Sequence, residues 1–317
     1  MTRSAIAVSG LRKAYGDKVV LDGIDLTVAP GSIYSLLGPN GAGKTTMVNV
    51  LTTLLKADAG TIRVAGHDVA TATRQVRAAI GVTGQFAAVD DLLSGRENLQ
   101  LMADLKHIRS SDPIVTRLLE RFDLVESADR MVSTYSGGMR RKLDLAMTLV
   151  GNPQIIFLDE PTTGLDPRSR RTMWAIVREL VAEGGTIFLT TQYLEEADQL
   201  ADQIAVLHQG RLVAEGTPEE LKRQVGGSHV QFRFAEIHEL ETAARLLPES
   251  TRDDEELTLR VPHDGESRSL VALLNRLDQQ SINAQEFSVR TPDLDDVFLA
   301  LTDQTSTKPT SKEAIAR

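Results

Sequence analysis

Residues 38–46 read GPNGAGKTT and match the pattern G-x-x-x-x-G-K-[ST], which is typical of loops that bind phosphate groups. Glycines let the backbone curl so that successive N–H groups point at an anion, and the positive end of a following helix adds to the attraction. Lys44 can reach the β- and γ-phosphates of a nucleotide, and the Thr45 hydroxyl can ligate Mg²⁺. The sequence therefore predicts a phosphate-binding set made of Gly38, Pro39, Asn40, Gly41, Ala42, Gly43, Lys44, Thr45 and Thr46.

Two acids follow a second apolar segment, residues 155–158. Continuous apolar character predicts a strand that is buried on both faces, and parallel sheets bind their ligands at the carboxyl ends of such strands. Asp159 can hold Mg²⁺ there, and Glu160 can orient and polarise an attacking water. On their own, two acids after a strand are more often solvated residues. Beside a phosphate loop they indicate a nucleotide hydrolase, a class that includes kinases and motor ATPases.

A third motif, Ser136-Gly137-Gly138, opens a helical pattern at residues 137–150. A serine followed by two glycines at a helix start offers a hydroxyl, backbone N–H groups and a helix dipole to an anion. The simpler interpretation of Ser136 alone is an N-cap.

Together the three motifs resemble the nucleotide-binding domain of the ATP-binding-cassette (ABC) family. The resemblance implies a homodimer in which Ser136, Gly137 and Gly138 of one subunit close over an ATP held by the phosphate loop of the other. It also implies that Tyr15 stacks on adenine and that Gln85 contacts Mg²⁺ and the attacking water. Asp166 would lie on the loop that crosses the dimer interface.

Two departures from the family pattern are visible in the sequence. Tyr135 and Met139 replace the outer residues of the common Leu-Ser-Gly-Gly-Gln signature, and Gln192 stands where the family usually has a histidine. Glutamine can donate an amide hydrogen bond to a γ-phosphate, but it does not titrate near pH 7. The resemblance therefore implies a catalytic set of Glu160, Gln192 and Gln85, and a metal set of Thr45, Gln85 and Asp159.

The strings TTQYLEEAD, TYSGGMRRKLDLA and LDDVFLALT resemble the daunorubicin/doxorubicin resistance type of ATP-binding subunit. That resemblance implies an ATPase subunit that drives a separate ABC-2 type permease and exports an amphipathic drug or lipid. The chain would then sit on the cytoplasmic side of the membrane as a peripheral subunit. Two other interpretations stay open: a soluble ABC ATPase of translation or DNA repair, and a nucleotide-binding regulator that hydrolyses poorly.

The segments that must position these residues alternate between short apolar strands and helices. Strands are expected at residues 32–37, 80–83, 155–158, 186–190 and 204–207, and helices at residues 44–53, 137–150 and 167–183. This alternation predicts a parallel sheet with helices on its faces, so the fold class is α/β. The resemblance makes it an ABC-type P-loop domain with a helical subdomain.

Charge divides the chain into two parts. Residues 227–317 hold 10 Lys and Arg against 17 Asp and Glu, within a whole-chain net charge of −9. We therefore expect a nucleotide-binding domain at residues 1–226, a small α+β domain at residues 227–302 and a disordered tail at residues 303–317. Strands at residues 230–234, 256–261 and 286–290, and helices at residues 240–247, 268–278 and 294–301, are expected in the small domain.

Composition excludes several classes of function. An acidic chain disfavours nucleic acid as a partner, and the absence of cysteine removes thiol chemistry. The six histidines do not fall at metal-ligand spacing. The sequence also contains no uninterrupted run of about 18 apolar residues, the length that would predict a membrane span. The basic stretch Arg140-Arg141-Lys142 is interpreted as a solvated face of its helix.

Overall fold

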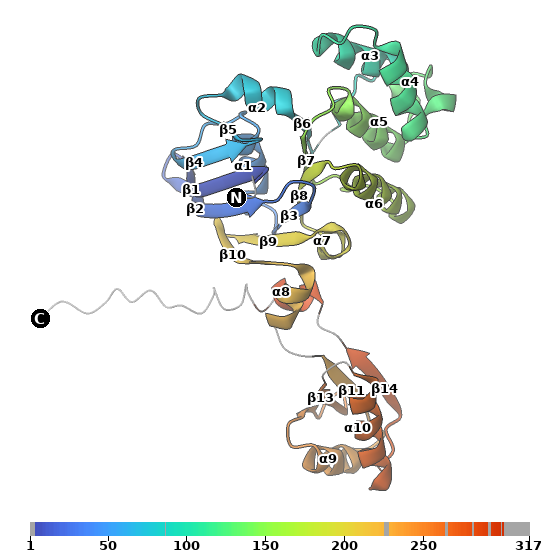
Figure 1. Ribbon diagram of the computed structural model, residues 1–317. Helices are drawn as coiled ribbons and strands as arrows, with labels where there is room; N and C mark the ends of the chain where they lie inside the picture. Colours follow the sequence, from blue (N-terminus) through green and yellow to red (C-terminus); the bar gives the residue numbers. More distant parts are fainter. Residues whose placement is uncertain are drawn as a thin grey trace, which may run out of the picture. The chain divides into compact units, whose positions relative to one another are not determined.

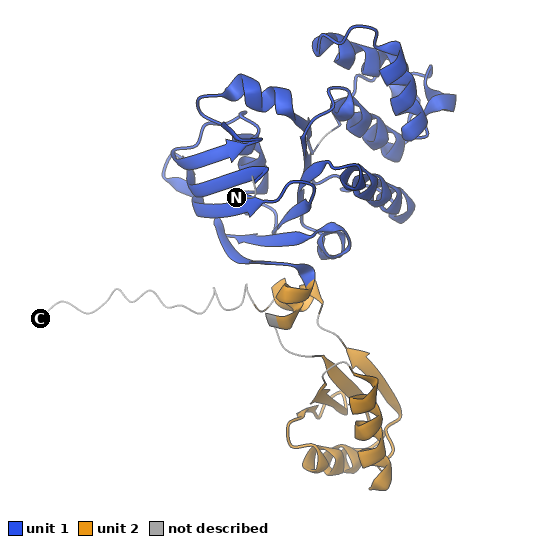
Figure 2. Cartoon of the chain, in the orientation of Figure 1, with its two compact units in different colours: residues 1–218 blue, residues 219–317 orange. Residues whose placement is uncertain are grey.

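The computed structural model describes residues 4–85, 87–224, 228–263, 266–280, 282–290, 293–298 and 300. The chain divides into two compact units, Met1–Pro218 and Glu219–Arg317, which are coloured separately in Figure 2. The domain boundary expected between residues 226 and 227 and the tail expected at residues 303–317 lie outside the described residues.

A six-stranded sheet forms the centre of the first unit, in the order β10-β9-β3-β8-β7-β6 (Figure 1). Its five parallel strands are those expected from the sequence, and β10 pairs antiparallel with β9 at one edge. Every residue of β3, β7 and β8 is buried, which explains their continuous apolar sequences. The strands are β3 (Ile33–Leu37), β6 (Ile80–Thr83), β7 (Ile155–Asp159), β8 (Thr186–Thr191), β9 (Gln203–His208) and β10 (Arg211–Gly216).

A second, antiparallel sheet of the first unit has the order β2-β1-β4-β5 and was not expected from the sequence. Its strands are β1 (Ile6–Tyr15), β2 (Lys18–Val28), β4 (Ala59–Val64) and β5 (His67–Asp68). One apolar cluster joins this sheet to the parallel sheet through α1 (Lys44–Leu51), whose Met47, Val48 and Leu51 are buried in it. The antiparallel sheet therefore holds the helix that follows the phosphate loop. Helix α2 (Thr73–Ala79) leads from this sheet into β6.

Helices α3 (Gly95–Leu105), α4 (Asp112–Arg121) and α5 (Gly137–Leu149) lie together on the side of the unit away from β1, β2 and β4 (Figure 1). Helix α3 begins with a capping box in which Ser94 and Glu97 satisfy each other's backbone N–H groups. Helices α6 (Pro167–Ala182) and α7 (Leu194–Leu200) follow β7 and β8. Apolar residues of α3, α4, α5, α6 and the parallel sheet form one core cluster, so the helical arm is packed onto the sheet.

Helix α8 (Pro218–Gln224) begins at the last residue of the first unit, and the second unit then alternates strands with helices. The elements are β11 (His229–Arg233), α9 (Ile237–Leu246), β12 (Thr251–Asp253), β13 (Thr258–Pro262), α10 (Ser267–Gln279) and β14 (Glu286–Arg290). The four strands form an antiparallel sheet in the order β12-β13-β11-β14, and this unit has its own apolar core. Of the last expected helix, residues 294–298 and 300 are described, and they are helical.

None of the helices in the described part of the chain combines the length and the apolar character needed to span a membrane.

Candidate functional site

Four parallel strands bring the predicted site residues to one edge of the sheet. Gly38 follows β3, Gln85 lies shortly after β6, Glu160 follows β7 and Gln192 follows β8. Because these strands are parallel, their carboxyl ends lie at the same edge. The Gly38 N–H also donates to the Thr191 carbonyl at 3.2 Å, which ties the start of the phosphate loop to the end of β8.

The phosphate loop depends on glycine at two positions for two different reasons. A Cβ on Gly38 would lie 2.4 Å from the backbone oxygen of Leu207, so the neighbouring strand leaves no room for a side chain. Gly43 has φ +113°, a backbone conformation that residues with a side chain rarely adopt, and it lies directly before α1. Asn40, Gly41 and Thr45 are exposed, so the outer surface of the loop is open to solvent.

Lys44 is buried, and its ammonium group lies between the loop and an acid. The Nζ atom donates to the Gly38 carbonyl at 2.7 Å and to the Pro39 carbonyl at 3.2 Å. It also lies 3.2 Å from Oε1 of Glu160, and only 4% and 8% of the two side chains are exposed. A buried ion pair of this kind is screened little by solvent, and each charge offsets the cost of burying the other.

Glu160 is held at the end of β7 in a strained conformation. Its φ is +50°, and its N–H donates to the carbonyl and the hydroxyl oxygen of Thr190, both at 3.1 Å. Its carboxylate accepts a hydrogen bond from Thr163 at 3.3 Å and a long one from the Gln85 amide at 3.5 Å. Backbone strain in a residue of this kind is common at functional sites. The arrangement aims one carboxylate at Lys44 and Gln85 together.

Asp159 lies directly before Glu160 and is almost fully buried. Its carboxylate accepts a hydrogen bond from the Thr190 hydroxyl. Thr190 therefore contacts both acids, a role that the sequence analysis did not assign to it. Hydroxyl, carboxylate and amide oxygens of Thr45, Asp159 and Gln85 make a donor set that suits Mg²⁺.

Two predicted residues lie at the periphery. Tyr15, at the end of β1, is 51% exposed, and the ammonium group of Lys13 lies 5.7 Å from its ring centroid. Gln192 is half-buried between β8 and α7. An exposed aromatic ring is available for stacking on another flat group.

The Ser136-Gly137-Gly138 motif is not joined to the phosphate loop of its own chain by any hydrogen bond among the described residues. Ser136 caps α5 by accepting from the Met139 N–H, so the N-cap interpretation is correct. Ser136 and Gly137 are nevertheless exposed, and a Cβ on Gly137 would meet nothing within 4 Å. Asp166 caps α6 in the same way, and its hydrogen bonds to Ser169 lower the pKa of its carboxyl.

The interpretation of Arg140-Arg141-Lys142 as a solvated face was wrong for Arg141. Its side chain is 8% exposed and donates to the carbonyls of Gly84 at 2.7 Å and Pro161 at 2.8 Å. It also contacts Asp144 at 3.2 Å, one turn further along α5. The sequence offered one signal for this position, the acid three residues later within a run of apolar residues.

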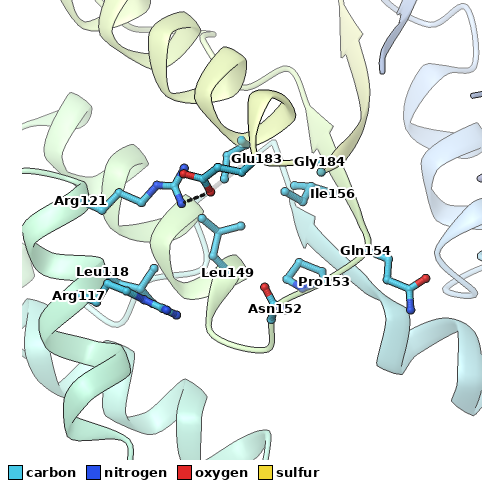
Figure 3. Close-up of a pocket in the computed structure, with 12 residues that line it drawn as sticks. Arg117, Leu118, Arg121, Leu149, Asn152, Pro153, Gln154, Ile156, Glu183 and Gly184 are labelled. Carbon is cyan, nitrogen blue, oxygen red and sulfur yellow. Dashed lines mark hydrogen bonds and ion pairs between the residues drawn. The ribbon is translucent and has the colours of Figure 1, made fainter. Parts of the chain in front are cut away.

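A cavity of about 450 Å³ lies at the opposite edge of the sheet, where β7 begins at Ile155 (Figure 3). Arg121 and Glu183 form an ion pair at 2.7 Å across it, and Arg117 lines the same side. The C-terminal ends of α4, α5 and α6 meet here, and their partial negative charges account for the two arginines. This cavity is remote in the fold from Lys44 and Glu160.

The fold and the strand-edge site are those of an ATP-hydrolysing domain of the ABC class. Residues 21–163 match the ABC transporter family, and residues 216–302 match the C-terminal domain of DrrA1-3-like ATP-binding proteins. Two solved structures, an ATP binding subunit of an ABC transporter and an ATP-binding cassette of an ABC transporter in its ADP conformation, both superpose with a TM-score of 0.63. They are 27% and 28% identical to this chain, cover 70% and 69% of it, and are each covered to 93%.

Several curated proteins are similar over nearly the whole chain. The daunorubicin resistance ATP-binding protein DrrA3 of Streptomyces coeruleorubidus is 50% identical, with 95% of this chain and 97% of that protein covered. The daunorubicin/doxorubicin resistance protein DrrA of Streptomyces peucetius is 45% identical, with 98% and 96% covered. The Nod factor export ATP-binding protein I of Rhizobium sp. (strain N33) is 38% identical, with 95% and 98% covered.

The chain therefore belongs to the ABC transporter ATP-binding subunits, in the group of the daunorubicin/doxorubicin resistance type. The predicted family, fold class and ATPase activity are confirmed, and an ABC ATPase of translation or DNA repair is not favoured.

Proposed function

We propose that this chain hydrolyses ATP at the Lys44 and Glu160 edge and thereby powers the export of an amphipathic compound through a separate permease of the ABC-2 type. The observation that carries the catalytic part is the buried contact between Lys44 and Glu160, at the carboxyl ends of β3 and β7. A phosphate-binding cation and a candidate general base are held there within one ion pair.

ATP brings several negative charges to the phosphate loop, and these compete with Glu160 for Lys44. When Lys44 turns to the phosphates, the Glu160 carboxylate is released and can accept a proton from an attacking water. The Gln85 amide donates to Glu160. Gln192 follows β8 at the same edge, where its amide would donate to the γ-phosphate. Tyr15 offers its exposed ring to adenine. Thr45, Asp159 and Gln85 would hold Mg²⁺, which would neutralise part of the phosphate charge when bound.

The dimeric part of the proposal is supported by the exposed Ser136 motif. Its N–H groups and hydroxyl lie on the surface at the positive end of α5 and make no hydrogen bond to the phosphate loop of the same chain among the described residues. A second copy arranged head to tail would place this anion site over its ATP. The homodimer, the domain limits of residues 1–226 and 227–302, and the position on the cytoplasmic side of the membrane belong to this proposal.

The substrate class rests on the relatives. Proteins named for daunorubicin resistance, doxorubicin resistance and Nod factor export are 38–50% identical to this chain over nearly its whole length. Drug-like and lipid-like amphipathic compounds are therefore the class that we propose for this chain.

The test of the proposal compares the wild-type chain with Glu160→Gln and with Glu179→Gln, a matched change on the exposed surface of α6. We expect MgATP hydrolysis by the wild type and by Glu179→Gln, and we expect Glu160→Gln to accumulate as a dimer with MgATP in light scattering. Coexpression with the permease encoded nearest to it should recruit the chain to membranes. A wild-type chain without ATPase activity, or Glu160→Gln that stays monomeric at saturating ATP, would contradict the proposal.

A further inference from the structure

The Arg141 guanidinium lies where three parts of the site meet. It belongs to α5, which starts at the Ser136 motif, and it donates to the carbonyl of Gly84 directly before Gln85. Its Nε donates to Pro161, and its Nη2 donates to the carbonyls of Asp159 and Glu160, both at 3.3 Å. One side chain thus contacts the backbone of the two acids, the backbone of the residue after them and the backbone of the residue before Gln85.

Asp144 completes this arrangement from the same helix. Its Oδ2 lies 3.2 Å from Arg141, and its Oδ1 accepts from the Ala88 N–H at 3.0 Å. One buried ion pair therefore holds the backbone of Gly84 through Arg141 and that of Ala88 through Asp144. Burial lowers the pKa of Arg141 and raises that of Asp144, and the attraction between the two opposes both shifts.

We infer that Arg141 and Asp144 are positioning residues for ATP hydrolysis, which fix Gln85 relative to Glu160 and link that geometry to α5, the helix that starts at the Ser136 motif. This inference rests on the proposed function of Glu160. Neither side chain contacts Lys44 among the described residues, so the phosphate loop does not depend on the pair.

The test uses Arg141→Met, which keeps the apolar volume and removes the donors, and Arg141→Met/Asp144→Leu, which removes both charges. A single partner left alone is a buried unpaired charge and lowers stability, whereas replacing both partners by apolar residues often restores it. We expect turnover to fall by about 10²-fold in both variants, as a misplaced catalytic group does. The affinity for ATP should change less than about threefold, because the phosphate-binding atoms are untouched.

The double variant Arg141→Met/Asp144→Leu distinguishes a role of Arg141 in stability from a role in positioning Gln85. If Arg141 only stabilises the fold, turnover recovers when the melting temperature recovers, and the inference is overturned. If it positions Gln85, turnover stays low in the stable double variant, and Gln85→Ala adds little further loss to it. A wild type that does not hydrolyse ATP refutes the proposed function, whereas an active wild type with unaffected variants refutes only this inference.

A separate feature of the second unit supports an independent proposal. Strand β14 pairs with β11 on one side, and no described strand pairs with its other side. Phe287 and Val289 are opposite Phe232 and Val230, which are fully buried, yet they are themselves 48% and 44% exposed. The apolar face of the sheet therefore continues to an edge strand whose outer side pairs with no described strand.

The sequence of β14, Glu-Phe-Ser-Val-Arg, is complementary to itself in antiparallel pairing. A twofold axis at Ser288 places Glu286 opposite Arg290 of a second copy, and Phe287 opposite its Val289. We propose that β14 pairs with β14 of a second copy and joins the two C-terminal sheets into one. Opposite charges and apolar pairs directly across two strands stabilise such an arrangement, and like charges destabilise it.

The chain has no cysteine, so a single Ser288→Cys reports this contact alone. Directly opposed residues have Cα atoms about 4.5–5.5 Å apart, within the range that a disulfide spans. Under mild oxidation we expect Ser288→Cys to form a cross-linked dimer and Thr251→Cys, on the opposite edge strand β12, to remain monomeric. Adding Lys44→Ala keeps the experiment independent of ATP.

Charge reversal gives the deciding comparison. Glu286→Arg or Arg290→Glu in the Ser288→Cys chain should lower the cross-linked yield severalfold, since each puts like charges opposite one another. The two reversals together should restore it. Equal yields from all four chains, or cross-linking of Thr251→Cys to the same extent, would overturn the proposal.

Discussion

Glu160→Gln is the perturbation whose effect on binding can be worked from the structure. Before Lys44 can contact phosphate it must leave an ion pair with Glu160 at 3.2 Å, in which both side chains are buried. A hydrogen bond to a charged group contributes about 1.5–3 kcal/mol and a neutral one about 0.5–1.5 kcal/mol. Glutamine therefore lowers the cost of releasing Lys44 by about 1–1.5 kcal/mol, which is roughly a fivefold to tenfold gain in ATP affinity.

In the proposed mechanism the same change removes the general base, so it should lower turnover by about 10²–10⁴-fold. Tighter binding together with slower hydrolysis is the expected pair of results, measured by calorimetry with ATP and by phosphate release. Glu179→Gln on the exposed face of α6 should change neither value. Weaker ATP binding by Glu160→Gln would refute the idea that Lys44 is shared between the acid and the phosphates, and unchanged turnover would refute the role of Glu160 as the base.

Three other variants test separate parts of the structure. Gln192→Ala should lower turnover by about 10²–10³-fold while it still binds ATP. The hydrolysis rate of the wild type from pH 6 to 8 should lack the step near about pH 6.5 that Gln192→His can introduce. Full activity of the alanine variant would leave Gln192 a packing residue. Gly38→Ala should lower the free energy of unfolding by about 1–3 kcal/mol, because its Cβ would clash with the backbone oxygen of Leu207. Gly137→Ala is the control, since its Cβ would meet nothing within 4 Å. Burial raises the pKa of Glu196, so the folded state binds more protons than the unfolded state. The free energy of unfolding therefore falls as the pH rises from the ordinary glutamate pKa through the raised one. Glu196→Gln keeps an acceptor for Thr162 and Trp174, and urea unfolding should show it more stable than the wild type at pH 8 but not at pH 4.5.

The parallel sheet was predictable because burial on both faces forces its strands to be apolar throughout. The five expected strands are β3, β6, β7, β8 and β9, each within a residue or two of its predicted limits. The antiparallel sheet was not predicted, because its long strands are irregular. β1 and β2 contain Gly10 and Gly23 at positive φ, and the register of their pairing shifts three times. These interruptions break the alternation of apolar and polar residues that identifies a half-buried strand.

The phosphate loop and the two acids could be found in the sequence because each follows a recognisable strand at a fixed position. The contacts of Arg141 could not be found in this way. Its acceptors are backbone carbonyls of Gly84, Asp159, Glu160 and Pro161, and a carbonyl leaves no trace in the residue type. A rule that places charged helix residues in solvent fails where folded loops offer several unpaired acceptors at one point.

The positions of the buried charges connect ATP binding to catalysis. Lys44 offsets Glu160, and Arg141 offsets Asp144, so each of these four buried groups has an oppositely charged partner in the chain itself. ATP can displace only the first pair, because only Lys44 lies at the phosphate loop. In the proposed mechanism, the Lys44 ammonium that moves to the phosphates is the charge that had neutralised the Glu160 carboxylate. The Arg141 contacts keep the backbone of Glu160 in place during this exchange. In the mechanism that we propose, the Glu160 carboxylate becomes a free base when ATP is bound, and the chain without ATP keeps it paired with Lys44.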